Sequence, residues 1–166
     1  ADYFANASRD DIGWTELVAR RMGESVKKAI TDNMRNTSGM TALSDKWKKS
    51  KLKYGFSPNP WDYQDWMVKH GIADVQVNIS QWDVSVIVEP SKATYPSKTP
   101  PGEHLSPPIK ANLLFRILEY GSSKNPPRPV LLPVIQQLDA GNFQPINKLL
   151  DQMVDTIEAR FSSKTS

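Results

Sequence analysis

The chain has 166 residues and a formal net charge of +3, a mild basic bias that permits a nucleic-acid partner without requiring one. It contains no cysteine, so disulfides, thiolate nucleophiles and cysteine metal sites are excluded. Hydrophobic residues make up 39% and charged residues 23%, a balance that suits one folded domain with a buried core rather than a disordered chain.

Residues 1–11, ADYFANASRDD, are short and polar. They lack the basic flank and apolar stretch of a signal peptide, and no apolar run in the chain approaches the about 18 residues that cross a membrane. We therefore expect a protein made in the cytoplasm with no membrane partner. Residues 1–11 are predicted to be an N-terminal arm, in which Asp10 or Asp11 caps the following helix.

The first predicted helix runs from about Trp14 to Met34, because apolar residues recur there with helical spacing. This stripe consists of Leu17, Val18, Met22, Val26, Ala29 and Ile30. Gly23 lies within the helix and should weaken it by roughly 1 kcal/mol relative to alanine. We expect the packing of the stripe to outweigh that cost.

A second, shorter helix is predicted over LSDKWKKSKLK, residues 43–53, with Ser44 as its cap. Leu43, Trp47 and Leu52 are its expected apolar anchors. The segment also holds a run of lysines, namely Lys46, Lys48, Lys49, Lys51 and Lys53. Such a run indicates either a solvated face or a surface that contacts DNA phosphates or an acidic partner.

The following residues contain the clearest strand signal in the chain. YGFSPNPW reads as a loop, and WDYQDWMVKHG as one or two helical turns closed by Gly71. Apolar and polar residues then alternate over 73–79 and again over 82–88, which predicts an antiparallel hairpin with one buried face. Because two strands alone are marginal in water, the hairpin needs a covering helix or strands from another subunit.

Residues 89–108 hold six of the thirteen prolines and show no periodicity. A loop of this length is usually functional or disordered, and we expect it to contact a partner. A helix is predicted from about Pro108 to Tyr120, closed by Gly121. Its apolar face consists of Leu113, Leu114, Ile117 and Leu118.

After this helix, VLLPVIQQLDAG is predicted to be a short strand or turn that leads into a helix. Residues 145–161 then form the best amphipathic helix of the chain, and residues 162–166 a flexible tail. The apolar face of that last helix consists of Ile146, Leu149, Leu150, Met153, Val154, Ile157 and Phe161.

The sequence shows no arrangement of residues that would support catalysis. Its two histidines, His70 and His104, have no metal-ligand or catalytic spacing around them. Asp62 and Asp65 are interpreted as surface charges, and no nucleophile elbow or phosphate-binding loop occurs. We therefore predict that the protein is not an enzyme and has no cofactor or metal.

The stretch LEYGSSKNPPRPVLLP, residues 118–133, joins the helix that ends near Tyr120 to the next segment. Glu119 lies near a helix C-terminus, where the helix dipole disfavours an acid, so a compensating group is expected. Arg128 follows across a short loop, and we predict a Glu119–Arg128 ion pair. That pair is either a local clamp or a contact shared across a subunit interface.

This junction resembles the signature of the bacteriophage virion-morphogenesis family, the neck or tail-completion proteins of long-tailed phages. The matching residues are Glu119, Tyr120, Gly121, Pro127, Arg128, Pro129 and Pro133. The family also has an N-terminal helix, a lysine-rich segment and a hairpin, and this order agrees over about 15–135. Leu43, Ser44, Trp47 and Lys51 resemble the lysine-rich segment, and residues 73–88 the hairpin.

These patterns predict one α+β domain over residues 1–166, with helices packed on a small antiparallel sheet and a long proline-rich loop over 89–108. The resemblance implies a non-enzymatic virion protein that forms a hexameric ring at the head–tail junction, around the DNA path. Its partners would be other copies of itself and the adjacent neck, connector or tail-tube proteins. The alternatives are a tail-terminator or head-closure ring, and a nucleic-acid-binding module that uses the lysines.

The junction, the 89–108 loop and the arms are the expected subunit contacts, since closed rings need heterologous interfaces. The expected interface residues at the junction are Glu119, Tyr120, Gly121, Arg128, Pro129 and Pro133. On this view, Arg128→Glu should abolish ring assembly while the monomer stays folded.

Overall fold

The structure is a computed structural model, and it describes residues 9–53, 58–61, 66–80, 83–94, 110–123 and 125–162. Within these residues, six helices pack with a two-stranded antiparallel sheet, so the predicted α+β class is confirmed. The elements are α1 (Arg9–Arg35), α2 (Asp45–Lys53), α3 (Trp66–His70), β1 (Gln76–Ile79), β2 (Val84–Ile87), α4 (Ala111–Tyr120), α5 (Leu132–Asp139) and α6 (Gln144–Ser162).

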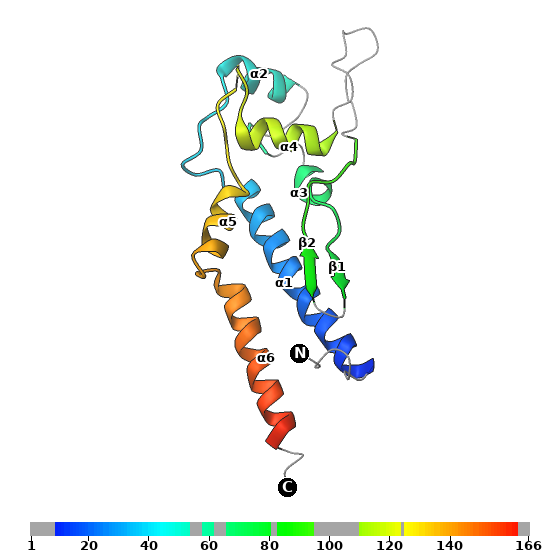
Figure 1. Cartoon of the computed structure of the whole chain (residues 1–166). Coiled ribbons are helices and arrows are strands. Elements are labelled where there is room, and N and C mark those ends of the chain that lie inside the picture. The colour runs from blue at the N-terminus through cyan, green and yellow to red at the C-terminus, as the bar shows by residue number, and fades with distance from the viewer. Residues whose placement is uncertain are drawn as a thin grey trace.

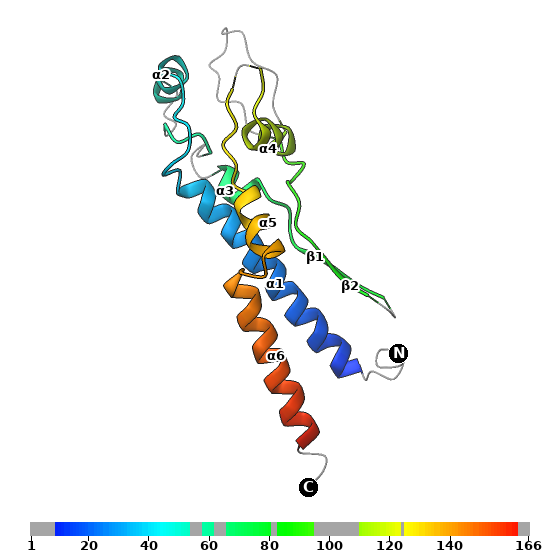
Figure 2. The same cartoon turned by 60° about the vertical axis from the view of Figure 1, so that its left-hand side comes forward.

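The molecule is elongated, as Figures 1 and 2 show. Helix α1 runs along much of its length. Helices α2 and α4 lie at the upper end in these views, whereas α6 extends to the opposite end beside α1. The hairpin lies along α1 on the other side from α6 (Figure 1).

Helix α1 begins at Arg9, so the predicted N-terminal arm was too long by three residues. Asp10 and Asp11 therefore lie inside the helix rather than capping it. Acidic residues are favourable in a first turn, where they face the positive end of the helix dipole. Residues 1–8 lie outside the described part of the chain.

The hairpin packs on α1 through its apolar face, as predicted. Strands β1 and β2 pair with Val77 opposite Val86 and Ile79 opposite Val84. At Gly23 the approach of α1 to the sheet leaves no room for a side chain. A Cβ at Gly23 would lie 2.7 Å from Val86 Cγ1 and closer still to Val75 Cγ1. The glycine is therefore a packing requirement of the helix–sheet interface, a role that the sequence interpretation missed.

The chain on either side of residues 95–109 is held together by backbone hydrogen bonds. The N–H of Ala111 donates to the Ala93 carbonyl at 2.8 Å, and the N–H of Asn112 donates to the Ser91 carbonyl at 2.9 Å. The chain before residue 95 and the chain after residue 109 thus lie at adjoining points of the fold. Most of the predicted loop, residues 95–108, lies outside the described residues.

The hydrophobic core lies toward the α2–α4 end of the molecule and collects residues from α1, α3, α4 and α5. Trp61 is fully buried, and its ring meets Phe115 edge-on, with centroids 5.0 Å apart. The core consists of Ile30, Met34, Trp61, Met67, Val68, Ile72, Ala111, Leu114, Phe115, Leu118, Val130, Val134 and Phe143. In α4, Leu114 and Leu118 face this core as predicted, whereas Leu113 is exposed.

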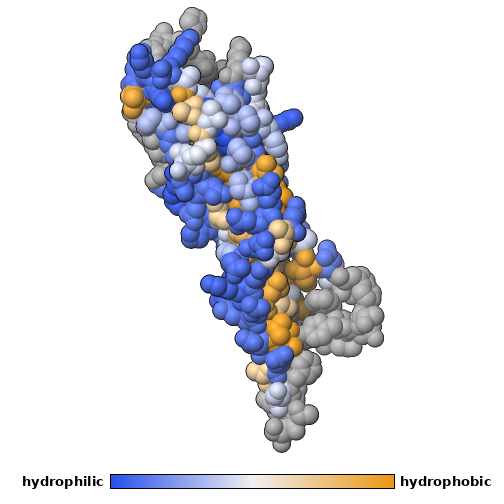
Figure 3. Space-filling model, turned by 90° about the vertical axis from the view of Figure 1, so that its left-hand side faces the viewer, coloured by the Kyte–Doolittle hydropathy of each residue, from blue (hydrophilic) through white to orange (hydrophobic). Residues whose placement is uncertain are grey.

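Helix α5 starts at Leu132, where the sequence analysis expected a strand or turn, and Pro133 occupies its first turn. Helix α6 follows as predicted, but its apolar face is incompletely covered. Leu150 is 45% exposed and Val154 is 53% exposed. Figure 3 shows apolar side chains forming a strip along the lower half of the molecule in that view.

No helix in the described residues is long and apolar enough to cross a membrane. The described ranges also contain no cluster of three or more histidine, aspartate or glutamate residues that could hold a metal ion. His104, Asp62, Asp65, Trp82 and the tail at 163–166 fall outside the described residues. His70 is exposed at the end of α3, with its ring 5.5 Å from that of Trp66.

Candidate assembly site at the α4–α5 junction

Glu119 caps helix α5 from the end of helix α4. Its carboxylate accepts hydrogen bonds from the backbone N–H groups of Val130 at 2.7 Å, Leu131 at 3.0 Å and Leu132 at 2.8 Å. Val130 and the N-cap residue Leu131 directly precede α5, and Leu132 is its first residue. N–H groups at the start of a helix have no intrahelical acceptor, and Leu131 supplies no side-chain acceptor of its own. Glu119 is only 4% exposed. The carboxylate therefore does for α5 what a local Ser or Asp cap usually does.

Arg128 is buried, with 1% of its surface exposed, and it binds backbone carbonyls. Its Nε donates to the Thr41 carbonyl at 2.7 Å, and its Nη2 donates to the Ala42 carbonyl at 3.0 Å. These carbonyls belong to the segment between α1 and α2. The guanidinium also lies 5.8 Å from the centre of the Trp47 ring, which is cation–π distance. Arg128 thus fastens the α1–α2 segment and α2 to the junction.

The backbone of Arg128 adds two further bonds. Its N–H donates to the Leu118 carbonyl at 2.7 Å, which satisfies a carbonyl in the last turn of α4. Its carbonyl accepts from the indole Nε1 of Trp61 at 2.9 Å. From α1, the side-chain amide of Asn33 donates to the Val130 carbonyl at 2.9 Å. One short segment therefore bonds to α1, α4, Trp61 and the segment before α2.

The predicted Glu119–Arg128 pair is not formed. The sequence analysis correctly expected a compensating group for an acid at the end of α4, but that group is the N-terminus of α5. Both side chains are buried and bond to this chain's own backbone, so neither presents a charge to a neighbouring subunit. The expectation that they make direct interface contacts was wrong. For the same reason, Arg128→Glu would damage the fold and could not isolate assembly from folding.

Gly121 allows the chain to turn directly after α4. Its φ is +76°, a conformation that side chains strongly disfavour, and a Cβ there would lie 2.8 Å from the Asn125 carbonyl oxygen. A short turn follows, in which the N–H of Ser122 donates to that same carbonyl at 2.7 Å. The glycine is therefore needed for the turn.

Part of the accessible surface of the junction is apolar. Tyr120 is 72% exposed, and Pro129 and Pro133 are half-buried. Tyr120 and Pro129 border a groove of about 300 Å³ that follows the start of α5. Its lining consists of Glu119, Tyr120, Pro127, Pro129, Leu131, Leu132 and Ile135. Of the predicted interface residues, Tyr120, Gly121 and the two prolines thus have accessible surface, whereas Glu119 and Arg128 are buried.

A second and larger groove, of about 440 Å³, lies on the other side of α5. It runs between α5, β2 and α1 and is lined almost entirely by apolar side chains. The lining consists of Met22, Gly23, Val26, Val86, Val88, Leu131, Val134, Ile135, Leu138 and Ile146. Helix α5 therefore has apolar surface on both flanks.

The lysines of α2 do not form one continuous surface. Lys46, Lys49 and Lys53 are exposed, and Lys48 lies 3.9 Å from Asp45 across one turn. Lys51 is only 3% exposed, and its ammonium group donates to the carbonyl of Asn59. The predicted role of Lys51 in DNA or acidic-partner contact was therefore wrong. Leu52, an expected anchor, is 60% exposed, whereas Leu43 is buried and Trp47 packs on the core as predicted.

The sequence analysis missed several residues that build the junction, including Trp61, Asn33 and Thr41. Each forms a hydrogen bond with a residue more than fifty positions away in the chain, so no local pattern indicates them. A usable signal did exist for α5. Pro133, followed by apolar residues at helical spacing, is the usual beginning of a helix and would have identified an N-terminus close to Glu119.

The junction is thus a network of buried backbone and charge-assisted hydrogen bonds. Among the described residues, no buried side-chain nitrogen or oxygen lacks a hydrogen-bond partner. Such a network fixes the relative positions of helices. Comparison with protein-family models, curated proteins and solved structures finds no match for this chain.

Proposed function

We propose that this chain is a structural subunit of a tailed-bacteriophage particle, which forms a ring at the head–tail junction as a neck or tail-completion protein. The observation that carries the proposal is the α4–α5 junction. Its sequence resembles the virion-morphogenesis signature, and the matched residues act together as a single rigid unit. Glu119 caps α5, Gly121 makes the turn, Arg128 fastens the α1–α2 segment, and Pro133 starts α5.

This arrangement suits an assembly subunit. A ring of identical copies requires each subunit to present its contact surfaces at a fixed angle. The junction sets the angle between α4 and α5, and exposed apolar residues lie directly beside it on α5. These are Leu132, Ile135 and Leu138. An apolar surface carried on a rigid frame is typical of a protein that docks on other proteins.

Two other positions in the same particle, a tail terminator and a head-closure ring, would use the same surfaces and remain alternatives. The nucleic-acid-binding module is less well supported, because the burial of Lys51 removes one of its five lysines.

The test is to delete the gene from the virus that encodes the chain and to examine the lysate by electron microscopy. The proposal predicts DNA-filled heads and separate tails in place of complete particles. Supplying the chain from a plasmid should restore joined particles. Complete, infectious particles without the chain would refute the role. Tails of uncontrolled length would instead indicate the tail-terminator position.

A further inference from the structure

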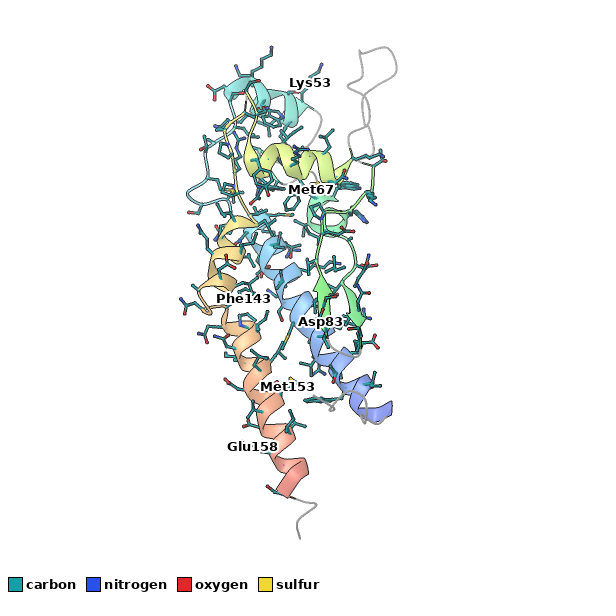
Figure 4. The ribbon with its side chains drawn as sticks, viewed as in Figure 1. Lys53, Met67, Asp83, Phe143, Met153 and Glu158 are labelled. Carbon is teal, nitrogen blue, oxygen red and sulfur yellow. The ribbon has the colours of Figure 1, made fainter. Side chains whose placement is uncertain are left out.

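Two helix faces at opposite ends of the molecule carry opposite charge and exposed apolar residues. Lys53, on α2, and Glu158, on α6, lie near the two ends in Figure 4. The α2 face holds three exposed lysines beside Leu52. The α6 face holds three exposed acids beside Leu150 and Val154. The two faces are too far apart to meet within one chain.

The charges on the two helices match in spacing. On α2 the lysines stand at positions 46, 49 and 53, and on α6 the acids stand at 151, 155 and 158. In each set the charged residues are separated by one gap of three residues and one gap of four, so they lie on one side of the helix. Each stripe is about 10 Å long at 1.5 Å per residue. The order of the gaps is reversed between the two stripes. An antiparallel arrangement therefore places Lys46 opposite Glu158, Lys49 opposite Asp155, and Lys53 opposite Asp151.

The apolar residues match in the same arrangement. With the stripes aligned in antiparallel fashion, Leu52 falls between Val154 and Leu150 along the helix axis. Successive residues of a helix are rotated by about 100° about its axis. When the two charged stripes face each other in antiparallel fashion, this rotation puts Leu52 and the Leu150–Val154 pair on the same side of the contact. A leucine that fits between two apolar side chains of a facing helix is the packing that helix pairs favour. A parallel arrangement would put the apolar residues on opposite sides.

We propose that the α2 face of one copy docks in antiparallel fashion on the α6 face of a second copy. The contact joins unlike surfaces, so it is heterologous and builds a ring when the rotation closes, or a filament when it does not. This inference rests on the proposed role as a ring subunit and names the surface that such a ring would use. The lysines of α2 then serve a protein partner of acidic character rather than DNA.

The contact is small, because α2 has only nine residues. Interfaces of this size are weak in isolation, and association should therefore appear only at high protein concentration. Charge pairs at a solvated interface are screened by salt. Sedimentation velocity of the full chain should show larger species that grow with concentration and dissociate as ionic strength rises.

Charge reversal on each face supplies a decisive test. Lys46→Glu with Lys49→Glu makes α2 acidic, and Asp151→Lys with Asp155→Lys makes α6 basic. Each double variant alone should be monomeric, with an apparent dissociation constant raised by about tenfold or more. In a mixture, the reversed α2 face of one variant meets the reversed α6 face of the other, and the natural α2 and α6 faces meet at the next contact. Assembly should therefore return, with the two variants alternating.

The α2 variant should stay folded, because acids are favourable in a first helical turn and the carboxylate introduced by Lys49→Glu would face Lys53 one turn on. A matched control is Lys92→Glu with Lys110→Glu, which makes the same charge change at exposed positions outside both faces. Far-UV circular dichroism and thermal melting of each variant verify that the monomers are native. The control should assemble like the natural chain.

Several results would overturn the interface. If both double variants assemble normally, the contact lies elsewhere, and the ring role itself stands. If the natural chain is monomeric at every concentration and salt, the two faces do not dock. If the natural chain associates only with duplex DNA, and the α2 variant alone loses that binding, the lysines form a nucleic-acid surface. Complete particles without the gene would instead refute the ring role.

Discussion

Around Arg128, charged side chains are buried and bonded to backbone atoms, whereas along α6, apolar side chains remain in contact with water. The junction end is built as protein interiors normally are, with polar groups satisfied and a core of aromatic and aliphatic residues. The α6 end buries little of its apolar face. The junction end therefore holds the packed core, whereas the α6 end exposes apolar surface, which the proposed ring would use for association together with the α2 face.

The largest loss of stability is expected for Arg128→Glu. It would bury a carboxylate against the Thr41 and Ala42 carbonyls, which now accept hydrogen bonds from the guanidinium. An unpaired buried charge costs about 4 kcal/mol or more, so the free energy of unfolding in urea should fall by that amount. Arg116→Glu, at an exposed position on α4, is the control and should change stability little. Equal effects at the two positions would mean that Arg128 is not a structural anchor.

Removing the cap of α5 should have the next largest effect. Glu119→Gln keeps the shape of the side chain but loses the charge and turns a donor amide toward the N–H groups of α5. We expect a loss of about 2 to 3 kcal/mol by urea unfolding, because hydrogen bonds to charged groups are strong and the orphaned N–H groups stay buried. The exposed Glu24→Gln provides the reference. A loss below the scatter of that reference would exclude the capping role.

Substituting the two glycines of α1 should separate close packing from helix propensity. Gly23→Ala forces the hairpin away from α1 and should destabilise the protein by about 1 to 3 kcal/mol, despite the gain in helix propensity. At Gly13 no atom lies within 4 Å of an added Cβ, so Gly13→Ala should stabilise by up to about 1 kcal/mol. Thermal melting of both variants checks the opposite signs. The same sign at both positions would contradict the close approach at Gly23.

The smallest effect is expected on the apolar face of α6. Leu150→Ser and Val154→Ser remove side chains that are already about half exposed. Each should change the free energy of unfolding by roughly 0.5 kcal/mol or less. Urea unfolding at low protein concentration is the measurement. Losses typical of core truncations would show that these residues stabilise the monomer, and the proposed division between the two ends would then fail.

The fold class, the hairpin and the apolar face of α4 followed from local patterns, because alternation and helical spacing record which side of an element is buried. The sequence predicted that Glu119 needs a compensating partner but did not identify that partner. The helix dipole required a compensating partner, but α5 was taken for a strand or turn, and its N-terminus was therefore overlooked. Arg128 was expected to be the partner of Glu119 because it is a nearby residue of opposite charge in the sequence. In the structure its guanidinium binds the Thr41 and Ala42 carbonyls instead.

The roles of Gly23 and Lys51 could not be found from local patterns. From sequence alone, a glycine in a helix is expected only to lower helix stability, because the element that packs on it is not known. Val75 and Val86, which pack on Gly23, lie more than fifty residues away in the chain. Lys51 looks like its neighbours in the run of lysines. Lys51 differs from the other lysines in that it donates a hydrogen bond to the Asn59 carbonyl. The position of that carbonyl depends on the tertiary fold and not on the local sequence.

The paired chain segments that flank residues 95–109 have a practical consequence. Because Ser91 and Ala93 are bonded to Asn112 and Ala111, the entry and exit of that excursion are pinned side by side. A foreign peptide can be spliced between them without separating the elements that they join, since lengthening a closed loop costs little entropy. The insertion would give a labelled chain whose two proposed association faces are untouched.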